Sequence, residues 1–394
     1  MTPAARAQAA IELLDDIIEA ARTAGAAADT IIARYFKTRR YAGSKDRRAV
    51  RELVYRAIRR SGEVPASGRA ALLGVAQDEP DLLRLFDGTA HAPAAPGDQE
   101  EATPATPAPL WLNGRFDPLV DEQELAALLE RAPLDLRVNR LKAERDEVQQ
   151  QLAGALTSPL SPVGLRLPDG TRIEEHPLWQ SGLVEVQDEG SQLLALACKA
   201  APEMTVVDLC AGAGGKTLAL AAKMEHRGRI VASDTDRGRL SKMGPRLQRA
   251  GVTIVEARLL NPGAEMQTLA DMKGSADLVL IDAPCSGTGT WRRNPETRWR
   301  LNPQRLTRLT QLQAHLLDVG AELVRPGGTL VYAVCSLLAE EGRGQAEAFA
   351  GRRSSFISQD VDIPGGRSSG LGRLLTPAHD GTDGFFVARW QAPC

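Results

Sequence analysis

The sequence predicts an α/β protein whose C-terminal half is a Rossmann-like, doubly wound parallel sheet. A strand-like apolar run over 205–209 leads into a loop with three glycines, and an alanine-rich helix over 218–224 follows. Further strand-like runs then alternate with helix-like runs as far as Ala333. Alternation of this kind implies a parallel sheet with helices on both faces. Ligands of such sheets bind outside the carboxyl ends of the strands, so the glycine loop is the first candidate for a site.

The glycine loop has the spacing Gly-x-Gly-Gly at residues 212–215. The dinucleotide fingerprint Gly-x-Gly-x-x-Gly is not met, and a P-loop would need a glycine where Cys210 stands. The next predicted strand, 229–233, ends in Asp234, where a carboxylate is placed to accept hydrogen bonds from ribose hydroxyls. Acids before and after the loop suit a nucleoside that carries a cationic group, and S-adenosyl-L-methionine fits that description. The alternatives are a structural glycine turn or another nucleotide.

Length and composition limit the other classes of protein. With 394 residues the chain is long enough for two or three domains. The formal net charge is −2, so any surface that binds nucleic acid must be local. The sequence shows no apolar run of about 18 residues and no signal-type N-terminus, so we expect no membrane span. Its five cysteines are widely spaced, without a Cys-x-x-Cys pair, so we expect no metal site, no disulfide framework and a cytoplasmic location.

The chain divides into four predicted segments. Residues 1–90 are predicted to form an all-α domain, because apolar side chains recur every three or four residues. Residues 91–109 are an Ala/Pro-rich linker, since prolines break helices. Residues 110–200 mix short helix-like and strand-like runs and are expected to form a small α+β domain, and residues 201–394 contain the parallel sheet. Helices are predicted over 121–129, 145–153, 190–200 and 306–324, and strands over 134–138, 183–186, 229–233, 253–255, 278–281 and 330–333.

Two clusters of basic residues are candidates for contacts with nucleic-acid phosphates. Between residues 34 and 69, twelve Lys or Arg residues accompany three acidic ones, and this local excess favours a phosphate-binding face over a solvated helix surface. The second cluster follows Cys285 and contains Trp291 and Trp299, which would offer stacking surfaces. The alternative for this cluster is a solvated loop with tryptophans in the core. Its arginines are Arg292, Arg293, Arg298, Arg300, Arg305 and Arg308.

Two cysteines follow predicted strands of the sheet. Cys285 lies in Asp282-Ala-Pro-Cys-Ser-Gly, after the strand 278–281, and Cys335 follows the strand 330–333. Both are therefore expected at the carboxyl edge of the sheet, beside the glycine loop. One such cysteine is more often an inert buried residue, but two cysteines at strand ends indicate specific chemistry.

In a fold that binds S-adenosyl-L-methionine, two such cysteines indicate methyl transfer to a pyrimidine as a candidate chemistry. Carbon 5 of a pyrimidine is a poor nucleophile until a thiolate, the reactive form of cysteine, adds to carbon 6. A base must then remove the carbon 5 proton so that the thiol is expelled. An acid such as Asp282, hydrogen-bonded at ring N3, would draw charge from the adduct. The pyrimidine must also be extruded from any stack to be reached.

Four stretches are specific enough to indicate a family: Cys210-Ala-Gly-Ala-Gly-Gly-Lys-Thr217, Asp282-Ala-Pro-Cys-Ser-Gly-Thr-Gly289, Leu330-Val-Tyr-Ala-Val-Cys-Ser336 and Asp383-Gly-Phe-Phe386. With them, the chain resembles the bacterial RNA 5-methylcytosine methyltransferases of the Sun/RsmB (NOL/NOP/Sun) family over nearly its whole length. Residues 44–55 look like part of a NusB-type helical RNA-binding domain. The resemblance implies a class I S-adenosylmethionine-dependent methyltransferase domain, preceded by this NusB-like domain and a small RNA-binding α+β domain.

The resemblance also implies a role for each residue that matches a family motif. Cys335 would be the nucleophile, and Cys285 would assist release of the enzyme from methylated RNA. Asp282 would contact the cytosine and lie near the methyl donor, and Lys216 would close the active site. The implied cofactor is S-adenosyl-L-methionine, and the implied substrate is RNA, 16S rRNA above all, with tRNA as an alternative. The cofactor-binding residues would be Cys210, Ala211, Gly212, Ala213, Gly214, Gly215, Lys216, Asp234 and Asp282.

Some residues depart from the family pattern. Gly212 and Ala213 stand where the family has alanine and proline, and Val334 replaces the usual threonine before the nucleophile. The proline and asparagine that the family carries after the second cysteine motif are absent from 338–342.

Two other functions are alternatives. In DNA cytosine-5 methylation Cys285 would be the nucleophile and Cys335 would be spare, but the basic helical segment and the second cysteine count against this function. A non-catalytic RNA-binding or assembly factor on the same fold is the alternative from another class. For the leading function we expect a monomer that acts without a metal.

Overall fold

The computed structural model describes residues 1–23 and 25–394, which form two compact units. The helical unit comprises Met1–Gly114, Leu125–Glu130 and Thr290–Pro303, and the sheet unit comprises Arg115–Glu124, Arg131–Gly289 and Gln304–Cys394. Each unit therefore contains segments that are far apart in the sequence.

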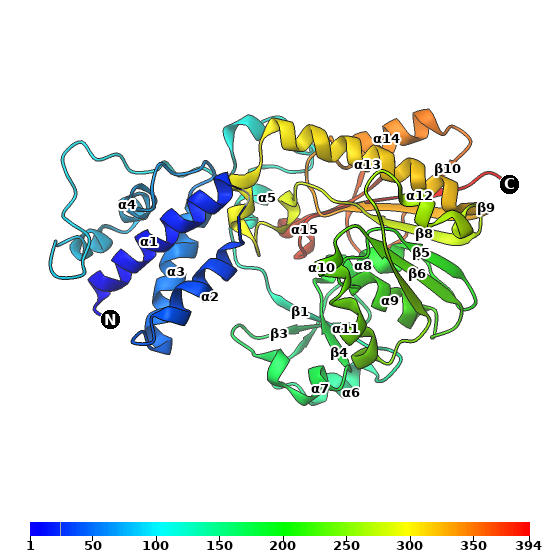
Figure 1. Cartoon of the computed structure of the whole chain (residues 1–394), viewed down its shortest axis with the longest axis horizontal. Helices are drawn as coiled ribbons and strands as arrows, with labels where there is room; N and C mark the ends of the chain where they lie inside the picture. Colours follow the sequence, from blue (N-terminus) through cyan, green and yellow to red (C-terminus); the bar gives the residue numbers. More distant parts are fainter. Residues whose placement is uncertain (24) are drawn as a thin grey trace. The chain divides into compact units, whose positions relative to one another are not determined.

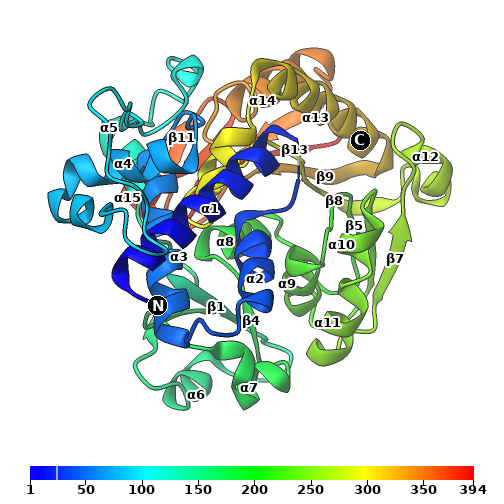
Figure 2. The same cartoon turned by 60° about the vertical axis from the view of Figure 1, so that its left-hand side comes forward.

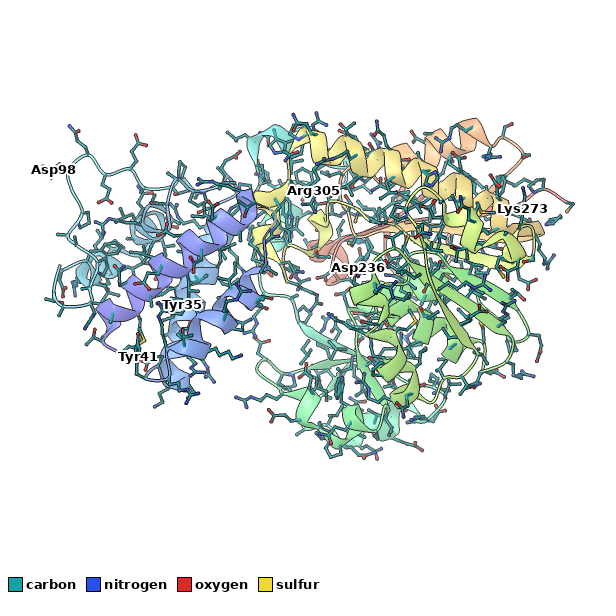
Figure 3. The ribbon with its side chains drawn as sticks, in the orientation of Figure 1. Tyr35, Tyr41, Asp98, Asp236, Lys273 and Arg305 are labelled. Atoms are coloured by element: carbon teal, nitrogen blue, oxygen red, sulfur yellow. The ribbon has the colours of Figure 1, made fainter. Side chains whose placement is uncertain are left out.

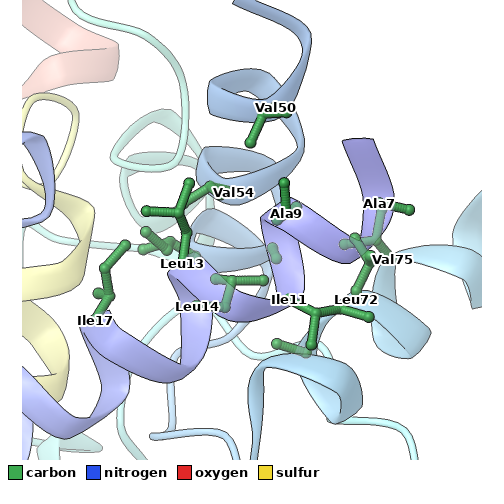
Figure 4. Close-up of a cluster of buried hydrophobic side chains, with 14 of the residues drawn as sticks. Ala7, Ala9, Ile11, Leu13, Leu14, Ile17, Val50, Val54, Leu72 and Val75 are labelled. Atoms are coloured by element: carbon green, nitrogen blue, oxygen red, sulfur yellow. The ribbon is translucent and has the colours of Figure 1, made fainter. Parts of the chain in front are cut away.

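The helical unit consists of α1 (Pro3–Arg22), α2 (Ala28–Thr38), α3 (Ser44–Arg60), α4 (Gly68–Asp78) and the 3-10 turns η1 (Pro80–Leu85), η2 (Leu110–Leu112) and η6 (Pro295–Arg300). Apolar side chains from one face of α1 and from α3 and α4 form its core, as Figure 4 shows. Helix α4 begins at Gly68, where a Cβ would overlap the carbonyl oxygen of Ile11 in α1. A glycine at this position therefore allows the two helices to approach each other.

Residues 91–109, the predicted linker, form neither helix nor strand apart from one bridge between Thr106 and Ser61. They are nevertheless packed on the helices. The amide of Thr103 donates to the carbonyl of Ala70 (2.9 Å), and the amide of Thr106 donates to the carbonyl of Arg60 (3.0 Å). The segment is therefore part of the helical unit.

The prediction that the second basic cluster contacts nucleic-acid phosphates was wrong for the residues at the centre of the cluster. Arg298 is fully buried in the helical unit, where its guanidinium donates to the carbonyl of Ile58 (2.6 Å). Trp299 is also buried, with its indole N–H donating to the carbonyl of Ser61 (2.7 Å), and Trp291 is fully buried. Burial lowers the pKa of Arg298 to about 9. The two tryptophans belong to the core, as the alternative held, whereas the burial of Arg298 agrees with neither the predicted phosphate track nor the alternative of a solvated loop.

The sheet unit contains a small antiparallel sheet with strand order β2-β3-β1-β4. The predicted strand 134–138 is confirmed as β1, which pairs with β3 and with β4. Apolar residues such as Leu136 and Leu165 meet in its core. The short helix α5 (Glu122–Ala127) precedes this sheet and is divided between the two units at Leu125. The elements of the small sheet and its connections are β1 (Leu134–Val138), α6 (Arg145–Gln150), β2 (Leu156–Thr157), β3 (Gly164–Leu167), η3 (Ile173–Glu175), α7 (Pro177–Gln180) and β4 (Val184–Val186).

The large sheet has nine strands in the order β11-β12-β13-β9-β8-β5-β6-β7, with β10 paired to β13. Its elements are α8 (Glu189–Ala197), β5 (Thr205–Asp208), α9 (Gly215–Lys223), β6 (Arg229–Asp234), α10 (Arg237–Leu240), α11 (Met243–Ala250), β7 (Val255–Leu259), α12 (Glu265–Thr268), η4 (Ala270–Met272), β8 (Ala276–Asp282), η5 (Thr288–Thr290), α13 (Pro303–Leu323), β9 (Val324–Val334), α14 (Arg343–Arg352), β10 (Ile357–Gln359), β11 (Arg367–Ser369), β12 (Gly372–Leu375), α15 (Pro377–Asp380) and β13 (Phe385–Gln391).

Strands β7, β6, β5, β8 and β9 run parallel, which confirms the predicted doubly wound sheet. Helices α13 and α14 cover one face, and α8 to α11 cover the other (Figure 1). In the register of β5, Val207 pairs with Val231 of β6 and with Val279 of β8. The chain crosses from β5 to β6 on one side and returns to β8 on the other. The end of β5 is therefore the switch point at which such sheets bind ligands.

Two features of the large sheet were not predicted. The C-terminal strands β10 to β13 pair antiparallel and extend the sheet beyond β9. Strand β7, at the sheet edge in Figure 2, begins at Val255, where the predicted strand 253–255 ends. The charged residues Glu256 and Arg258 obscured β7, because they lie on an edge strand and pair with Arg229 and Asp271.

Candidate active site

The glycine loop lies where the carboxyl end of β5 adjoins those of β6 and β8. Asp208 ends β5, and α9 begins at Gly215. Gly212 and Gly214 have φ angles of +56° and +84°, in the left-handed region that favours glycine. The amide of Ala211 donates to the carbonyl of Ser233 in β6 (2.9 Å), which ties the loop to the neighbouring strand. The glycines at 212 and 214 are thus explained by the backbone conformation.

Asp234, at the end of β6, is almost completely buried against this loop. Its Oδ2 accepts the amide of Gly212 (2.8 Å), and its Oδ1 accepts the amide of Asp236 (2.7 Å). The two amides fix the orientation of the carboxylate, and each oxygen still has a second lone pair for a ligand hydroxyl. The guanidinium of Arg239, which the sequence analysis did not single out, lies next to Gly212.

Two more arginines that the sequence analysis missed brace the glycine loop. Arg137 of β1 donates to the carbonyl of Gly215 (2.8 Å), and burial lowers the pKa of Arg137 to about 10. Arg246 of α11 donates to the carbonyl of Ala213 (2.8 Å) and forms an ion pair with Glu185 of β4 (2.9 Å). The small sheet therefore supports the loop directly. Local sequence carries no signal for these contacts, because the partners are 78 and 33 residues apart.

Lys216 and Asp282 form an ion pair at the edge of the sheet. Lys216 lies in the first turn of α9, and its Nζ donates to Oδ2 of Asp282 at the end of β8 (2.7 Å). Burial opposes the charge on Lys216, but the attraction and hydrogen bond of Asp282, with a contribution from Cys335, raise the pKa of Lys216. The Asp282 side chain is 30% exposed, so it is accessible to a ligand. Lys216 also faces the ring of Phe385, at 5.8 Å from its centroid.

Cys285 and Cys335 lie side by side, with 3.4 Å between their Sγ atoms. They meet because they follow β8 and β9, which are neighbouring parallel strands. The hydrogen bond with Cys335 raises the pKa of Cys285 well above its usual range, and burial adds to this effect. Cys285 therefore stays protonated in the free protein. The structure thus brings the four predicted catalytic residues together as two contacting pairs at the carboxyl edge of the sheet.

Cys210 and Asp208 lie in the same region but differ from this pair. Burial, with the nearby charge of Asp282, raises the pKa of Cys210 well above its usual range. Cys210 is therefore a protonated structural residue of the loop. Burial also raises the pKa of Asp208 to about 7, although its hydrogen bond from Thr217 (2.7 Å) acts in the opposite direction.

The residues at this edge fit the predicted cofactor. The first turn of α9 begins at Gly215, and first-turn amides of a helix favour a carboxylate. Asp234 presents acceptors for ribose hydroxyls, and the accessible carboxylate of Asp282 suits a positively charged sulfonium. Around Gly215 the nearest side-chain atoms lie 3.9 Å from the position of a Cβ, so its backbone is approachable.

Within residues 1–23 and 25–394, no group of three or more His, Cys, Asp and Glu side chains is arranged to hold a metal ion. None of the helices described in these ranges combines the length and the apolar character that a membrane crossing requires.

The parallel sheet with its switch point at β5, the glycine loop and the acid after β6 define a methyltransferase of the Rossmann-like class. The chain belongs to the RsmB/F family: a family profile described as 16S rRNA methyltransferase RsmB/F matches residues 195–391. The probable ribosomal RNA small subunit methyltransferase B of Synechocystis is 37% identical over 297 residues, which are 71% of this chain and 66% of that protein. The matched stretch thus spans just under two thirds of that relative.

Two solved structures have the same fold. The crystal structure of PH0851 has a TM-score of 0.78 and 24% identity, and the match covers 99% of both chains. NSun6 from Pyrococcus horikoshii, solved with SFG, has a TM-score of 0.61 and 20% identity over 68% of this chain and 93% of that chain. At these identities the likeness establishes a shared architecture.

Proposed function

We propose that the protein transfers a methyl group from S-adenosyl-L-methionine to carbon 5 of a cytosine in 16S rRNA, through a covalent bond between Cys335 and carbon 6. The observation that carries this proposal is the 3.4 Å contact between Cys285 and Cys335, beside the ion pair of Lys216 and Asp282. Membership of the RsmB/F family supports the methyl transfer and the rRNA substrate. We place the reaction in the cytoplasm and the enzyme in a monomeric state.

Cys335 begins the proposed reaction. Its thiolate sulfur forms a bond to carbon 6, and the electron pair of the carbon 5–carbon 6 double bond makes carbon 5 nucleophilic. Lys216 stabilises the thiolate before the attack, and Asp282 hydrogen-bonds the cytosine ring. S-adenosyl-L-methionine, when bound, supplies the electrophilic methyl group that carbon 5 acquires.

Cys285 completes the reaction. Carbon 5 must lose its proton, after which the double bond re-forms and Cys335 leaves as a thiolate. While Cys335 is bonded to carbon 6 as a thioether, it is a poor partner for the hydrogen bond that is the largest cause of the raised pKa of Cys285. Cys285 therefore ionises more easily at the stage that needs a base for the carbon 5 proton. One proton is released to solvent in the complete reaction.

We also propose that the helical unit is the NusB-like RNA-binding domain and that the small antiparallel sheet contributes to RNA binding. Part of the predicted basic face is neutralised internally, for example Arg51 by Asp29 and Arg60 by Asp78. Five exposed cations of this face form neither an ion pair nor a side-chain hydrogen bond among the described residues, and Tyr41 beside them is 71% exposed (Figure 3). These five cations, called the α2–α3 basic surface below, are Arg34, Lys37, Arg40, Lys45 and Arg48.

The test uses S-adenosyl-L-methionine with a tritiated methyl group and protein-free 16S rRNA. Wild type, Cys335→Ala, Cys285→Ala and the control Cys394→Ser are compared on denaturing gels; Cys394 is the exposed cysteine at the end of the chain. We expect labelled RNA with wild type and with the control, no label with Cys335→Ala, and a stalled protein–RNA adduct with Cys285→Ala.

Three outcomes would contradict parts of the proposal. Activity that survives Cys335→Ala but is lost in Cys285→Ala would move the nucleophile to Cys285. Label in tRNA but not in 16S rRNA, in a parallel reaction, would overturn the substrate. Binding of RNA without S-adenosyl-L-methionine binding in a titration would favour the non-catalytic RNA-binding factor.

A further inference from the structure

Glu341 is a buried carboxylate close to the two cysteines, and neither sequence analysis nor the proposed mechanism assigns it a role. It is completely buried after the end of β9. Its Oε1 accepts the amide of Ser286 (2.9 Å) and Nε2 of Gln313 in α13 (2.9 Å). Its Oε2 accepts the hydroxyls of Ser286 and of Ser336, the latter at 2.6 Å. Tyr332 fixes the main chain, because its hydroxyl donates to the Glu341 carbonyl (2.7 Å).

Two of the three residues that donate to Glu341 are the immediate neighbours of the two cysteines. Ser286 follows Cys285, and Ser336 follows Cys335. The two serine hydroxyls also lie 3.1 Å from each other. One carboxylate therefore joins the loop after β8 to the loop after β9 at the residues next to their sulfur atoms.

Gln313 extends the same network to the other side of Cys285. Its Nε2 donates both to Glu341 and to the carbonyl of Pro284 (2.9 Å). Cys285 is thus flanked by two residues, Pro284 and Ser286, that are both fixed through the Gln313–Glu341 pair. A third link comes from Thr288, whose Oγ1 accepts the amide of Leu337 (2.8 Å).

A buried carboxylate is tolerated when hydrogen bonds compensate its lost hydration. A satisfied buried network also fixes geometry more closely than apolar packing of the same volume. Four hydrogen bonds converge on Glu341 from the two cysteine loops and α13. The network therefore limits how far the sulfur atoms of Cys285 and Cys335 can move apart.

We propose that Glu341 is a positioning residue that holds Cys285 and Cys335 at hydrogen-bonding distance by binding Ser286 and Ser336. The geometric part stands on the hydrogen bonds alone, and its consequence for catalysis rests on the proposed function. In that function the spacing places Cys285 beside the Cys335 adduct, where it removes the carbon 5 proton.

The geometric part is tested without RNA. In buffers of reduced and oxidised glutathione, the two thiols form an intramolecular disulfide while one oxidised glutathione gives two reduced molecules, and mass spectrometry gives the effective molarity of the pair. We expect Glu341→Gln to lower this effective molarity roughly tenfold. Ser336→Ala, which removes only the link to the Cys335 loop, is expected to lower it several-fold. The matched control is Glu340→Gln, because Glu340 is an exposed neighbour that pairs with Arg115. This variant is expected to give the same effective molarity as wild type.

Thermal unfolding and titration with S-adenosyl-L-methionine serve as checks of folding. Ser336→Ala is expected to unfold at a lower temperature but to remain folded at the assay temperature, with unchanged cofactor binding. An effective molarity equal to that of wild type in both Glu341→Gln and folded Ser336→Ala would overturn the proposal. If Glu341→Gln does not fold, Ser336→Ala alone decides.

The catalytic part is read from the protein–RNA adduct. We expect Glu341→Gln to lower kcat roughly tenfold with little change in KM and to accumulate the protein–RNA adduct. In a Cys285→Ala background, the same substitution should change neither kcat nor the amount of adduct further. Suppose that Glu341→Gln lowers the effective molarity but that no variant, including Cys285→Ala, forms a protein–RNA adduct. This outcome would refute the proposed function and leave the positioning role intact. Wild-type adduct levels and kcat in Glu341→Gln, in an enzyme that methylates RNA, would refute the positioning role.

Discussion

The ammonium of Lys216 and the carboxylate of Asp282 meet at 2.7 Å, and this contact joins the cofactor loop to the strand end that leads to Cys285. Lys216 lies in the first turn of α9, directly after the glycine loop, whereas Asp282 ends β8. The same ammonium acts on Cys335, since the charges of Asp282 and Cys335 both raise the pKa of Lys216. One cation thus connects the cofactor side of the site with its nucleophile.

Replacement of Lys216 by Met is expected to lower single-turnover methylation about 100-fold. The side chain stays unbranched and is only one atom shorter, but it loses the charge, which leaves Asp282 without its partner and Cys335 without a nearby cation. The measurement is transfer of a tritiated methyl group in single-turnover conditions. Lys223→Met, at the exposed far end of the same helix, is the control and should behave as wild type. A wild-type rate in Lys216→Met would exclude a catalytic role for the ion pair.

Asp208 predicts a pH-dependent stability. Burial raises its pKa from 3.8 to about 7, so between these values the folded protein binds a proton that the unfolded chain has lost. The stability contributed by this group therefore falls as pH rises through that interval and levels off above it. Asp208→Asn, which does not ionise, should become progressively more stable than wild type from pH 5 to pH 7, by about 2–3 kcal/mol in total.

Thermal unfolding at several pH values measures this difference. Asp169→Asn, an exposed carboxyl in the same unit, is the control and should show no such trend. A difference between Asp208→Asn and wild type that is constant from pH 5 to pH 8 would show that Asp208 ionises normally.

The α2–α3 basic surface makes a prediction about salt. Lys37→Gln with Arg40→Gln removes two exposed cations without ion pairs, so the dependence of RNA affinity on log salt should become shallower by about 1.5. The control double variant, Arg51→Gln with Arg84→Gln, changes net charge equally but removes cations that are paired with Asp29 and Asp81. Fluorescence anisotropy with labelled 16S rRNA fragments measures both. Equal slopes for the two double variants would show that net charge, not this surface, governs binding.

The parts of the site that were predicted from sequence share a local signal. The glycine loop follows a buried strand directly, and Cys285 and Cys335 follow strands of one parallel sheet, whose carboxyl ends necessarily meet. The parts that were missed depend on partners far along the chain. Arg137 reaches the carbonyl of Gly215 across 78 residues, and Glu341 reaches Ser286 across 55 residues.

The same reasoning applies to the fold. The alternation of strands and helices identified β5 to β9, because each strand is followed by its own crossover. The antiparallel addition of β13 to β9 has no local signal, since its direction is decided by pairs such as Phe386 with Val334. Arg298 was assigned to a surface because arginine is usually exposed, and only its carbonyl acceptors, such as Ile58 at a separation of 240 residues, show that it is buried.

Arg298 provides a test that separates a buried cross-link from a phosphate contact. Its guanidinium donates through three nitrogens to the carbonyls of Pro295 (3.1 Å), Pro107 (2.6 Å) and Ile58 (2.6 Å). Lysine keeps the charge but cannot reproduce this planar fork. Arg298→Lys should therefore destabilise the helical unit by about 2–4 kcal/mol, seen as faster hydrogen exchange in α3. The salt dependence of RNA binding should not change under conditions in which the unit stays folded. Arg308→Lys, at an exposed position of α13, is the control. Unchanged exchange together with weaker RNA binding in Arg298→Lys would mean that Arg298 contacts phosphate after all, because a lysine would then be tolerated in the fold and poorer only at the RNA.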